Sequence, residues 1–181
     1  YPKAELFVNG KSMGVRTKNP KSKNVTEKYR MIWDNVSYQA GEIRVVAYGD
    51  DGKAAEEKTV KTAGKAATFR MSADRDTLLP DPKELIFVDI DIVDKDGTFC
   101  PRAANFMFVK VEGAGKLRAL CNGDATDQTA FSSNYMKSFN GKLLAVVEPT
   151  GESGDVKITA YGHMLAPKTL TLKIQKPIET K

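Results

Sequence analysis

Hydrophobic and polar residues alternate with a period of two along most of the chain. In residues 84–93, Ile86, Val88, Ile90 and Ile92 should point to one face, whereas Asp89 and Asp91 should point to the other. Similar alternation runs through eight further segments: 4–8, 29–33, 42–48, 106–111, 117–121, 143–147, 156–161 and 168–175. Because successive side chains of a β-strand leave opposite faces of the sheet, this pattern predicts half-buried strands.

Turn-forming pairs fall between these segments, where antiparallel strands require them. Asn9-Gly10 and Asp51-Gly52 tolerate the positive φ of two-residue hairpin turns, and Asp96-Gly97 and Asn140-Gly141 punctuate the second half. No stretch of ten or more residues has the period of an amphipathic helix. Short, regularly spaced strands of this kind predict an all-β fold of immunoglobulin-like sandwiches.

One segment occurs twice. Residues 41–49 align with residues 154–162, and each copy reads Gly, acid, aliphatic, base, aliphatic, any residue, Ala, Tyr, Gly. We interpret both copies as the penultimate strand of a sandwich, followed by final strands at 56–61 and 168–175. The repeat predicts two tandem immunoglobulin-like β-sandwich domains, residues 1–63 and 64–181, with a short linker around Ala63-Gly64-Lys65.

The two predicted domains are unequal in length. An immunoglobulin-like sandwich takes about 100 residues, which suits the second domain but not the first. A domain of about 60 residues buries only about 60% of its unfolded surface. The chain starts at Tyr1, and a strand pattern begins within a few residues. We therefore expect the chain to be part of a longer polypeptide and the first domain to lack its first strand.

The composition and charge of the chain limit the classes of partner that it is expected to bind. Hydrophobic residues make up 41% of the chain and charged residues 28%, and no apolar run approaches the length of a membrane span. The net charge of +5 is concentrated in residues 11–30, where seven basic residues face one glutamate. No aromatic lies between Lys11 and Lys28, so this segment predicts a solvated loop and not a nucleic-acid-binding surface.

Acidic residues suggest two kinds of chemistry, and neither pattern is complete. Asp89 and Asp91 lie two apart on one face of a strand, about 6.5–7 Å between Cα atoms, a separation that resembles the acid and base carboxyls of glycosidases. Both should face solvent, so we interpret them as part of a polar outer face. The run from Asp94 to Gly97 lacks the spacing of an EF-hand and predicts a turn. Calcium held by loops between the domains stays open as an alternative.

The remaining residues of chemical interest predict structural roles. His163, the only histidine, should lie exposed in a loop, and no metal cluster forms around it. Trp33 is interpreted as a core residue, with a sugar-stacking platform as the alternative. Cys100 and Cys121 are interpreted as free, mostly buried thiols, although a single disulfide between their strands is geometrically possible.

The segment 121–141 is the least strand-like part of the second domain. Loops of nearly 20 residues without secondary structure usually have a function or a partner surface. Aromatic residues flanked by Asn, Asp and Ser are suited to binding a sugar or to docking on a neighbouring domain. The candidate ligand or interdomain surface consists of Asn122, Asp124, Asp127, Phe131, Tyr135 and Asn140.

Segments in both halves of the chain resemble a known family. Residues 4–14, AELFVNGKSMG, resemble the strand–turn–strand that follows the catalytic barrel in glycoside hydrolase family 2 β-galactosidases of bacterial, polysaccharide-degrading type. Trp33-Asp34 and the repeat segment 41–48 fit the same module. The second half is similar to the C-terminal, invasin-like sandwich of those enzymes at residues 74–75, 85–88, 93–97 and 122–124. The resemblance covers nearly the whole chain.

This resemblance implies a parent enzyme that cleaves terminal β-galactosides, or related β-glucuronides, with retention. Its two catalytic glutamates lie on an upstream (β/α)₈ barrel, and it needs no organic cofactor. No catalytic motif of the family occurs here, so the chain alone should have no hydrolase activity. A periplasmic or cell-surface location is likewise implied. We expect accessory modules that support or rim the barrel; the alternatives are a free-standing adhesin module and a carbohydrate-binding module.

Overall fold

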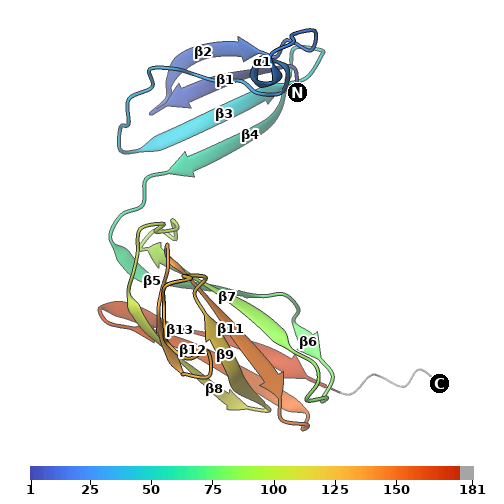
Figure 1. Cartoon of the computed structure of the whole chain (residues 1–181), viewed down its shortest axis with the longest axis vertical. Helices are drawn as coiled ribbons and strands as arrows, with labels where there is room; N and C mark the ends of the chain where they lie inside the picture. Colours follow the sequence, from blue (N-terminus) through green and yellow to red (C-terminus); the bar gives the residue numbers. More distant parts are fainter. Residues whose placement is uncertain (176–181) are drawn as a thin grey trace, which may run out of the picture. The chain divides into compact units, whose positions relative to one another are not determined.

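The computed structural model describes residues 1–175, which are almost entirely β-strand. They form two compact units, Tyr1–Thr62 and Ala63–Lys181, coloured blue to cyan and green to red in Figure 1. The one helix of the described residues, α1 (Val25–Tyr29), belongs to the first unit. The predicted all-β fold class is confirmed.

The first unit contains one antiparallel sheet in the order β2-β1-β3-β4. Its strands are β1 (Lys3–Val8), β2 (Lys11–Thr17), β3 (Glu42–Tyr48) and β4 (Ala54–Lys61). Asn9 and Gly10 have positive φ angles of 49° and 79° and form the predicted turn between β1 and β2. This sheet corresponds to one of the two layers of a sandwich. That the first domain lacks its first strand stays a prediction.

The predicted strand at 29–33 is wrong. The Asn24 side chain accepts a hydrogen bond from Thr26 N (2.9 Å) and caps α1, which ends at Tyr29. Trp33 lies beyond it in an irregular segment and donates from Nε1 to the carbonyl oxygen of Gly14 at 2.7 Å. Its half-buried ring therefore packs near β2, which agrees with the core interpretation more than with an open sugar platform.

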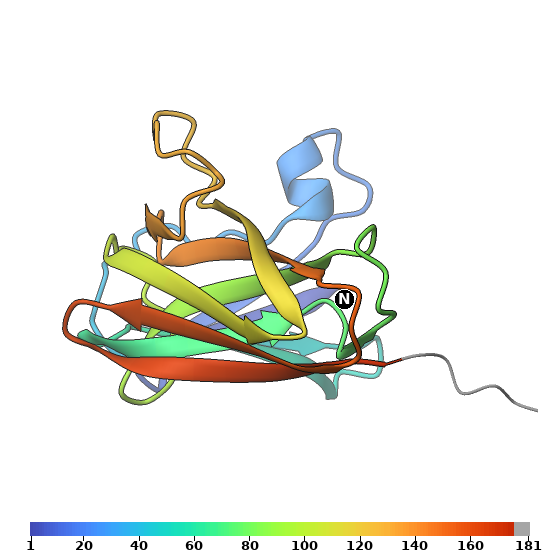
Figure 2. The same cartoon turned by 90° about the horizontal axis from the view of Figure 1, so that it is seen from below.

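The second unit is a two-layer sandwich. One sheet has the order β10-β8-β12-β13-β6 and the other the order β5-β7-β11-β9, with only the β13–β6 pair parallel. The two layers are seen from different sides in Figures 1 and 2. The strands are β5 (Ala66–Ala73), β6 (Thr77–Leu78), β7 (Ile86–Asp94), β8 (Phe106–Gly113), β9 (Gly115–Cys121), β10 (Tyr135–Lys137), β11 (Lys142–Pro149), β12 (Gly154–Gly162) and β13 (Leu165–Ile174).

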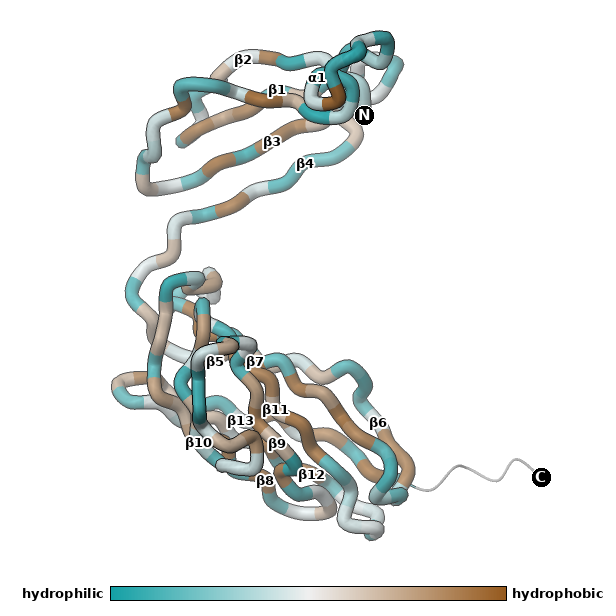
Figure 3. Tube along the Cα trace, in the orientation of Figure 1, coloured by the Kyte–Doolittle hydropathy of each residue, from teal (hydrophilic) through white to brown (hydrophobic). Residues whose placement is uncertain are grey.

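The aliphatic side of each alternating strand forms the core between these sheets. Ile86, Val88, Ile90 and Ile92 of β7 are all fully buried, and they pack with inward residues of the facing sheet such as Ile158. Figure 3 shows the resulting runs of brown along β7 and β11. Each such side chain contributes about 1.5–3 kcal/mol by leaving water, so this layer of contacts holds the sandwich together.

The repeated segment has the predicted topological role in both units. β3 pairs with β1 and with the final strand β4, and β12 pairs with β8 and with the final strand β13. The two copies differ in burial. Ile43 is 40% exposed, whereas Val156 at the aligned position is fully buried. The difference follows from the facing sheet, which the second unit has and the described residues of the first do not.

Candidate functional site

The loop 122–134, between β9 and β10, is held by its own polar side chains. Asn122 Nδ2 donates to Asp127 Oδ2 at 2.6 Å, and Asn122 Oδ1 accepts from Asp124 N at 2.9 Å. Asp124 Oδ1 accepts from the backbone and the hydroxyl of Thr126 (2.9 and 2.7 Å). The backbone N–H and hydroxyl of Thr129, together with Asn122, hold the pKa of Asp127 below its ordinary value. These three predicted site residues therefore form one network that shapes the loop.

The other three predicted residues of this surface lie outside that network. Phe131 is 63% exposed, while its carbonyl oxygen accepts from Leu120 N at 2.7 Å and ties the loop to β9. Asn140 occupies the turn between β10 and β11 with a φ of 50°. The loop is the amber segment that stands clear of the sheets in Figure 2. The side chains of Asn122, Asp124 and Asp127 are engaged locally, and Phe131 is the exposed aromatic residue of the loop.

Tyr135 belongs to an aromatic cluster that the sequence pattern did not predict. Its ring centroid lies 5.4 Å from that of Phe106 and 6.0 Å from that of Phe108, and the two phenylalanine rings meet edge-on at 5.5 Å. Tyr161 of β12 is the register partner of Phe108 and lies on the same face. All four side chains are 41–47% exposed. We call these four residues, on the outer face of β10, β8 and β12, the aromatic face.

A signal for the aromatic face is present in the alternation of β8. Met107 and Val109 are buried at 0% and 2% exposure, so Phe106 and Phe108 between and beside them must point outward. Large aromatic side chains at outward positions of a half-buried strand are unusual, although the alternation by itself predicts only the strand. To predict that Tyr135 and Tyr161 lie beside these residues, one needs the register of the neighbouring strands, which the sequence alone does not give.

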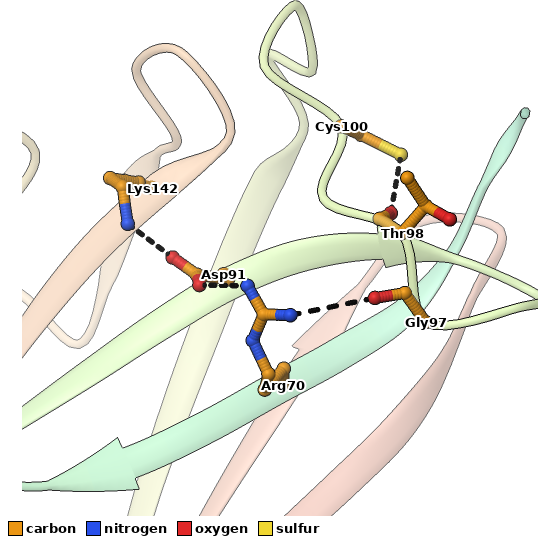
Figure 4. A network of polar contacts seen from close by, with 6 residues as sticks. All are labelled: Arg70, Asp91, Gly97, Thr98, Cys100 and Lys142. Atoms are coloured by element: carbon orange, nitrogen blue, oxygen red, sulfur yellow. Dashed lines mark hydrogen bonds and ion pairs between the residues drawn. The ribbon is translucent and has the colours of Figure 1, made fainter. Parts of the chain in front are cut away.

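The outer face of the other sheet has the opposite character. Asp91 accepts hydrogen bonds from Arg70 at 2.7 Å and from Lys142 at 2.6 Å, as Figure 4 shows. Burial alone would raise the pKa of Asp91, but the bonds from Lys142 and Arg70 outweigh it and hold the pKa below its usual value. Asp91 is thus an ionised structural carboxylate. Its pairing with two cations makes it unsuited to proton transfer with Asp89, in agreement with the polar-face interpretation.

A second carboxylate on this sheet has the same arrangement. Glu148 of β11 lies 2.8 Å from Lys116 and 3.3 Å from Arg118, both on β9. Like Asp91, its side chain is only 14% exposed. The outer face of the four-stranded sheet therefore carries two ion-pair networks whose charges are satisfied within the unit.

Asp94 forms the predicted turn and also fixes the start of the second unit. Its carboxylate accepts backbone N–H bonds from Gly64 (2.7 Å), Thr98 (2.8 Å) and Asp96 (2.9 Å). The bond from Gly64 is the chief cause that lowers the pKa of Asp94. Both oxygens of Asp94 are therefore engaged by the backbone. Among residues 1–175, no group of three or more His, Cys, Asp or Glu side chains could hold a metal ion.

The remaining predicted residues have structural positions. Cys100 and Cys121 are both free thiols, as predicted, with Cys100 buried and Cys121 half-buried. Burial, followed by the charge of Asp94, raises the pKa of Cys100. His163 lies exposed in the β12–β13 turn, as predicted. Within the described part of the chain, no helix has the length and apolar character needed to cross a membrane.

Comparison with known proteins decides the family. Residues 69–171, more than half of the chain, match the family model of the glycoside hydrolase family 2 C-terminal domain 5. The chain belongs to this family. Residues 1–56 match a second family model, described as a domain of unknown function (DUF4982). The two matches fall on opposite sides of the division between the structural units.

Relatives of this family 2 region are much longer than the chain. "Beta-galactosidase BoGH2A" of Bacteroides ovatus is 34% identical over 172 residues, which are 95% of this chain and 19% of that protein. A "Beta-glucuronidase" of Formosa agariphila is 25% identical over 171 residues, 93% of this chain and 16% of that protein. The chain thus spans less than a fifth of the length of these curated relatives.

Solved structures of family 2 enzymes contain a region with the same fold as this chain. A glycosyl hydrolase family 2 member from Bacteroides cellulosilyticus has a TM-score of 0.85 at 27% identity, over 97% of this chain and 22% of that one. A β-glycosidase from Bacteroides vulgatus has a TM-score of 0.86 at 25% identity, over 96% of this chain and 21% of that one. The chain matches the C-terminal, non-catalytic part of family 2 glycosidases, and the catalytic role lies elsewhere in such proteins.

Proposed function

We propose that the chain is the accessory β-sheet region of a secreted family 2 glycosidase and that it supports or rims an upstream catalytic (β/α)₈ barrel of the same polypeptide. The observation that carries this proposal is the 34% identity to a β-galactosidase over 95% of the chain but only 19% of that protein. We propose a retaining β-galactosidase as the parent, with β-glucuronidase as the second candidate because one relative has that name.

The geometry of the described residues supports a non-catalytic role for the chain itself. Retaining glycosidases need two carboxyl groups about 5–5.5 Å apart, one of which must be protonated. The half-buried carboxylates Asp91 and Glu148 are each paired with two basic side chains, and they belong to separate networks. This region therefore contributes a packing surface to the parent enzyme. The catalytic chemistry of that enzyme is assigned to the barrel.

The experiment compares the full-length polypeptide with a variant that lacks these 181 residues. We expect the full-length protein to hydrolyse an aryl β-galactoside or β-glucuronide, and the truncated protein to lose stability because an interdomain surface is exposed. A full-length protein without glycosidase activity would contradict the proposed parent. A truncated protein with an unchanged melting temperature would contradict the supporting role.

Two narrower proposals accompany this function. We propose that the first unit is completed by a strand from the preceding sequence, so extending the chain upstream by one strand should raise its melting temperature. We also propose a periplasmic or cell-surface location. Protease treatment of intact cells compared with spheroplasts tests it, because a cytoplasmic enzyme would stay protected in both.

Carbohydrate binding is the second candidate function, and the exposed aromatic residues favour it. Sugar rings stack on exposed aromatic faces, and the segment 122–140, which contains this loop and β10, carries Phe131 and Tyr135 beside polar groups. Titration with β-galactosides, followed by NMR shifts of residues 122–140, tests it. The absence of shifts at millimolar ligand would reject a sugar site on this surface.

A further inference from the structure

The two outer faces of the second unit differ in a way that indicates different neighbours. The face of β5, β7, β11 and β9 carries the ion-pair networks of Asp91 and Glu148, which suit contact with water. The face of β10, β8 and β12 carries the four aromatic residues at 41–47% exposure. The first of these faces has a single large exposed aromatic, Phe87, whereas four lie together on the other, which is therefore the better candidate for a partner surface.

We propose that the aromatic face is the surface by which the second unit docks on the catalytic part of its own polypeptide. This inference rests on the proposed function, because it takes the parent to be a larger glycosidase. The length of the relatives indicates which partner covers the aromatic face. In these relatives, more than four fifths of the residues lie outside the region that matches this chain. A segment of that size, joined covalently to this region, is its most abundant neighbour, and we therefore take it as the occupant.

The size of the aromatic face fits this role. With about 150–250 Å² for each aromatic side chain, the exposed fractions of the four residues sum to roughly 350 Å². The largest apolar patch on a typical monomer is about 300–600 Å² and is often functional, and the aromatic face falls within this range. Interfaces between domains of one chain bury about 600–1,500 Å², so the aromatic face would form the centre of such an interface.

The surroundings of the aromatic face resemble an interface core within a polar rim. Further along β8, Lys110 and Glu112 form an ion pair at 2.8 Å, and exposed Lys137 extends from β10 beside Phe106. Interface cores are enriched in Phe and Tyr and depleted in charge, whereas their rims are polar. Charged residues here flank the aromatic residues and do not interrupt them.

The ring geometry favours a protein partner over a sugar. Phe106 and Phe108 meet at an interplanar angle of 72°, and the angles of Tyr135 to them are 30° and 52°. The rings therefore present a mixture of edges and faces and do not form a flat platform. Such a surface suits interdigitating side chains, which fill the gaps between differently oriented rings.

Hydroxyl-radical footprinting of the 181-residue chain and of the full-length enzyme tests the proposal. We expect labelling of the four aromatic residues to fall about fivefold in the full-length enzyme, because buried apolar residues of this unit are at most 8% exposed. Phe87 is the matched control, since it is 42% exposed on the opposite sheet, and its labelling should stay unchanged. Equal labelling of the aromatic face in both proteins would overturn the proposal.

Two variants distinguish docking on the catalytic part from sugar binding and from self-association. Phe108→Thr in the full-length enzyme should restore labelling of Tyr135 and Tyr161, whereas Phe87→Thr should not. Both variants should fold as isolated chains because both side chains lie at the surface. Protection of the aromatic face in the isolated chain on adding a β-galactoside, or on raising the protein concentration, would instead assign it to a sugar or to a second copy.

The docking surface and the proposed function are contradicted by different results. A full-length protein with glycosidase activity and an unprotected aromatic face contradicts the docking surface alone. A full-length protein without that activity contradicts the proposed function.

Discussion

The Asp91 network offers a quantitative test of how the second unit is stabilised. Asp91→Asn keeps the size of the side chain but removes the charge that binds Arg70 and Lys142. The Asp91 side chain is 14% exposed, whereas those of Arg70 and Lys142 are 54% and 59% exposed. The carboxylate is therefore largely removed from water, while its two partners can be hydrated after the substitution.

The expected loss follows from these exposures. A hydrogen bond to a charged group is worth about 1.5–3 kcal/mol when well buried, but ion pairs with exposed partners give about 0.2–1 kcal/mol. With the lower range for each of the two bonds, Asp91→Asn should cost about 0.4–2 kcal/mol of unfolding free energy. For a unit of this size that corresponds to a decrease of about 2–8 °C in melting temperature.

The same network predicts a pH dependence. The pKa of Asp91 is lower in the folded protein than its ordinary value, so its stabilisation is fully present above the unfolded pKa, about 3.9. It is lost as the pH falls through the folded pKa. The difference in melting temperature between the wild type and Asp91→Asn should therefore be constant near neutral pH and shrink below about pH 4.

Differential scanning calorimetry from about pH 7 to about pH 2.5 measures both effects. Asp89→Asn is the control, because Asp89 is exposed two residues earlier on the same face and its substitution should change stability by less than about 0.5 kcal/mol. Equal effects of the two substitutions, or a difference for Asp91→Asn that is as large at the acid end of this range as at neutral pH, would refute the reasoning.

Three further predictions concern side-chain packing, glycine positions and thiol burial in the second unit. Ile90→Ala should lower the unfolding free energy by about 3–4 kcal/mol in denaturant titrations and Ile90→Val by about 1 kcal/mol, since Ile90 is fully buried; equal losses would be inconsistent with tight packing. Gly113→Ala should destabilise more than Gly123→Ala, because both have positive φ but only the first would place a Cβ against a backbone carbonyl of β12. Cys121 should react with a thiol reagent at neutral pH much faster than Cys100, because Cys100 is buried and has a raised pKa. Similar rates for the two thiols would contradict the burial of Cys100.

The fold was predictable where one strand face is continuously apolar. β7 and β12 alternate strongly because one face lies in the core and the other faces outward, and both were predicted within a few residues of their bounds. β5 was missed because small residues occupy several of its positions and weaken the contrast. β6 and β10 have two and three residues, too few for any period to be recognised.

Contacts distant in sequence account for the rest. Residues 29–33 alternate like a strand, but the cap at Asn24 starts a helix and Trp33 bonds to Gly14, 19 residues earlier. The candidate site has the same difficulty. Tyr135 was predicted as a site residue, yet its neighbours come from β8 and β12, and only the strand order brings them together. Local pattern fixes which side a residue faces, whereas register decides what lies beside it.

The most direct measurement is the turnover of aryl β-galactoside and β-glucuronide by the purified 181-residue chain beside the full-length polypeptide at equal molar concentration. We predict hydrolysis by the full-length protein and none by the chain alone, because the described carboxylates Asp91 and Glu148 are held in structural networks. Turnover by the chain that persists through further purification and is abolished by Asp91→Asn or Glu148→Gln would contradict the assignment of this region as non-catalytic.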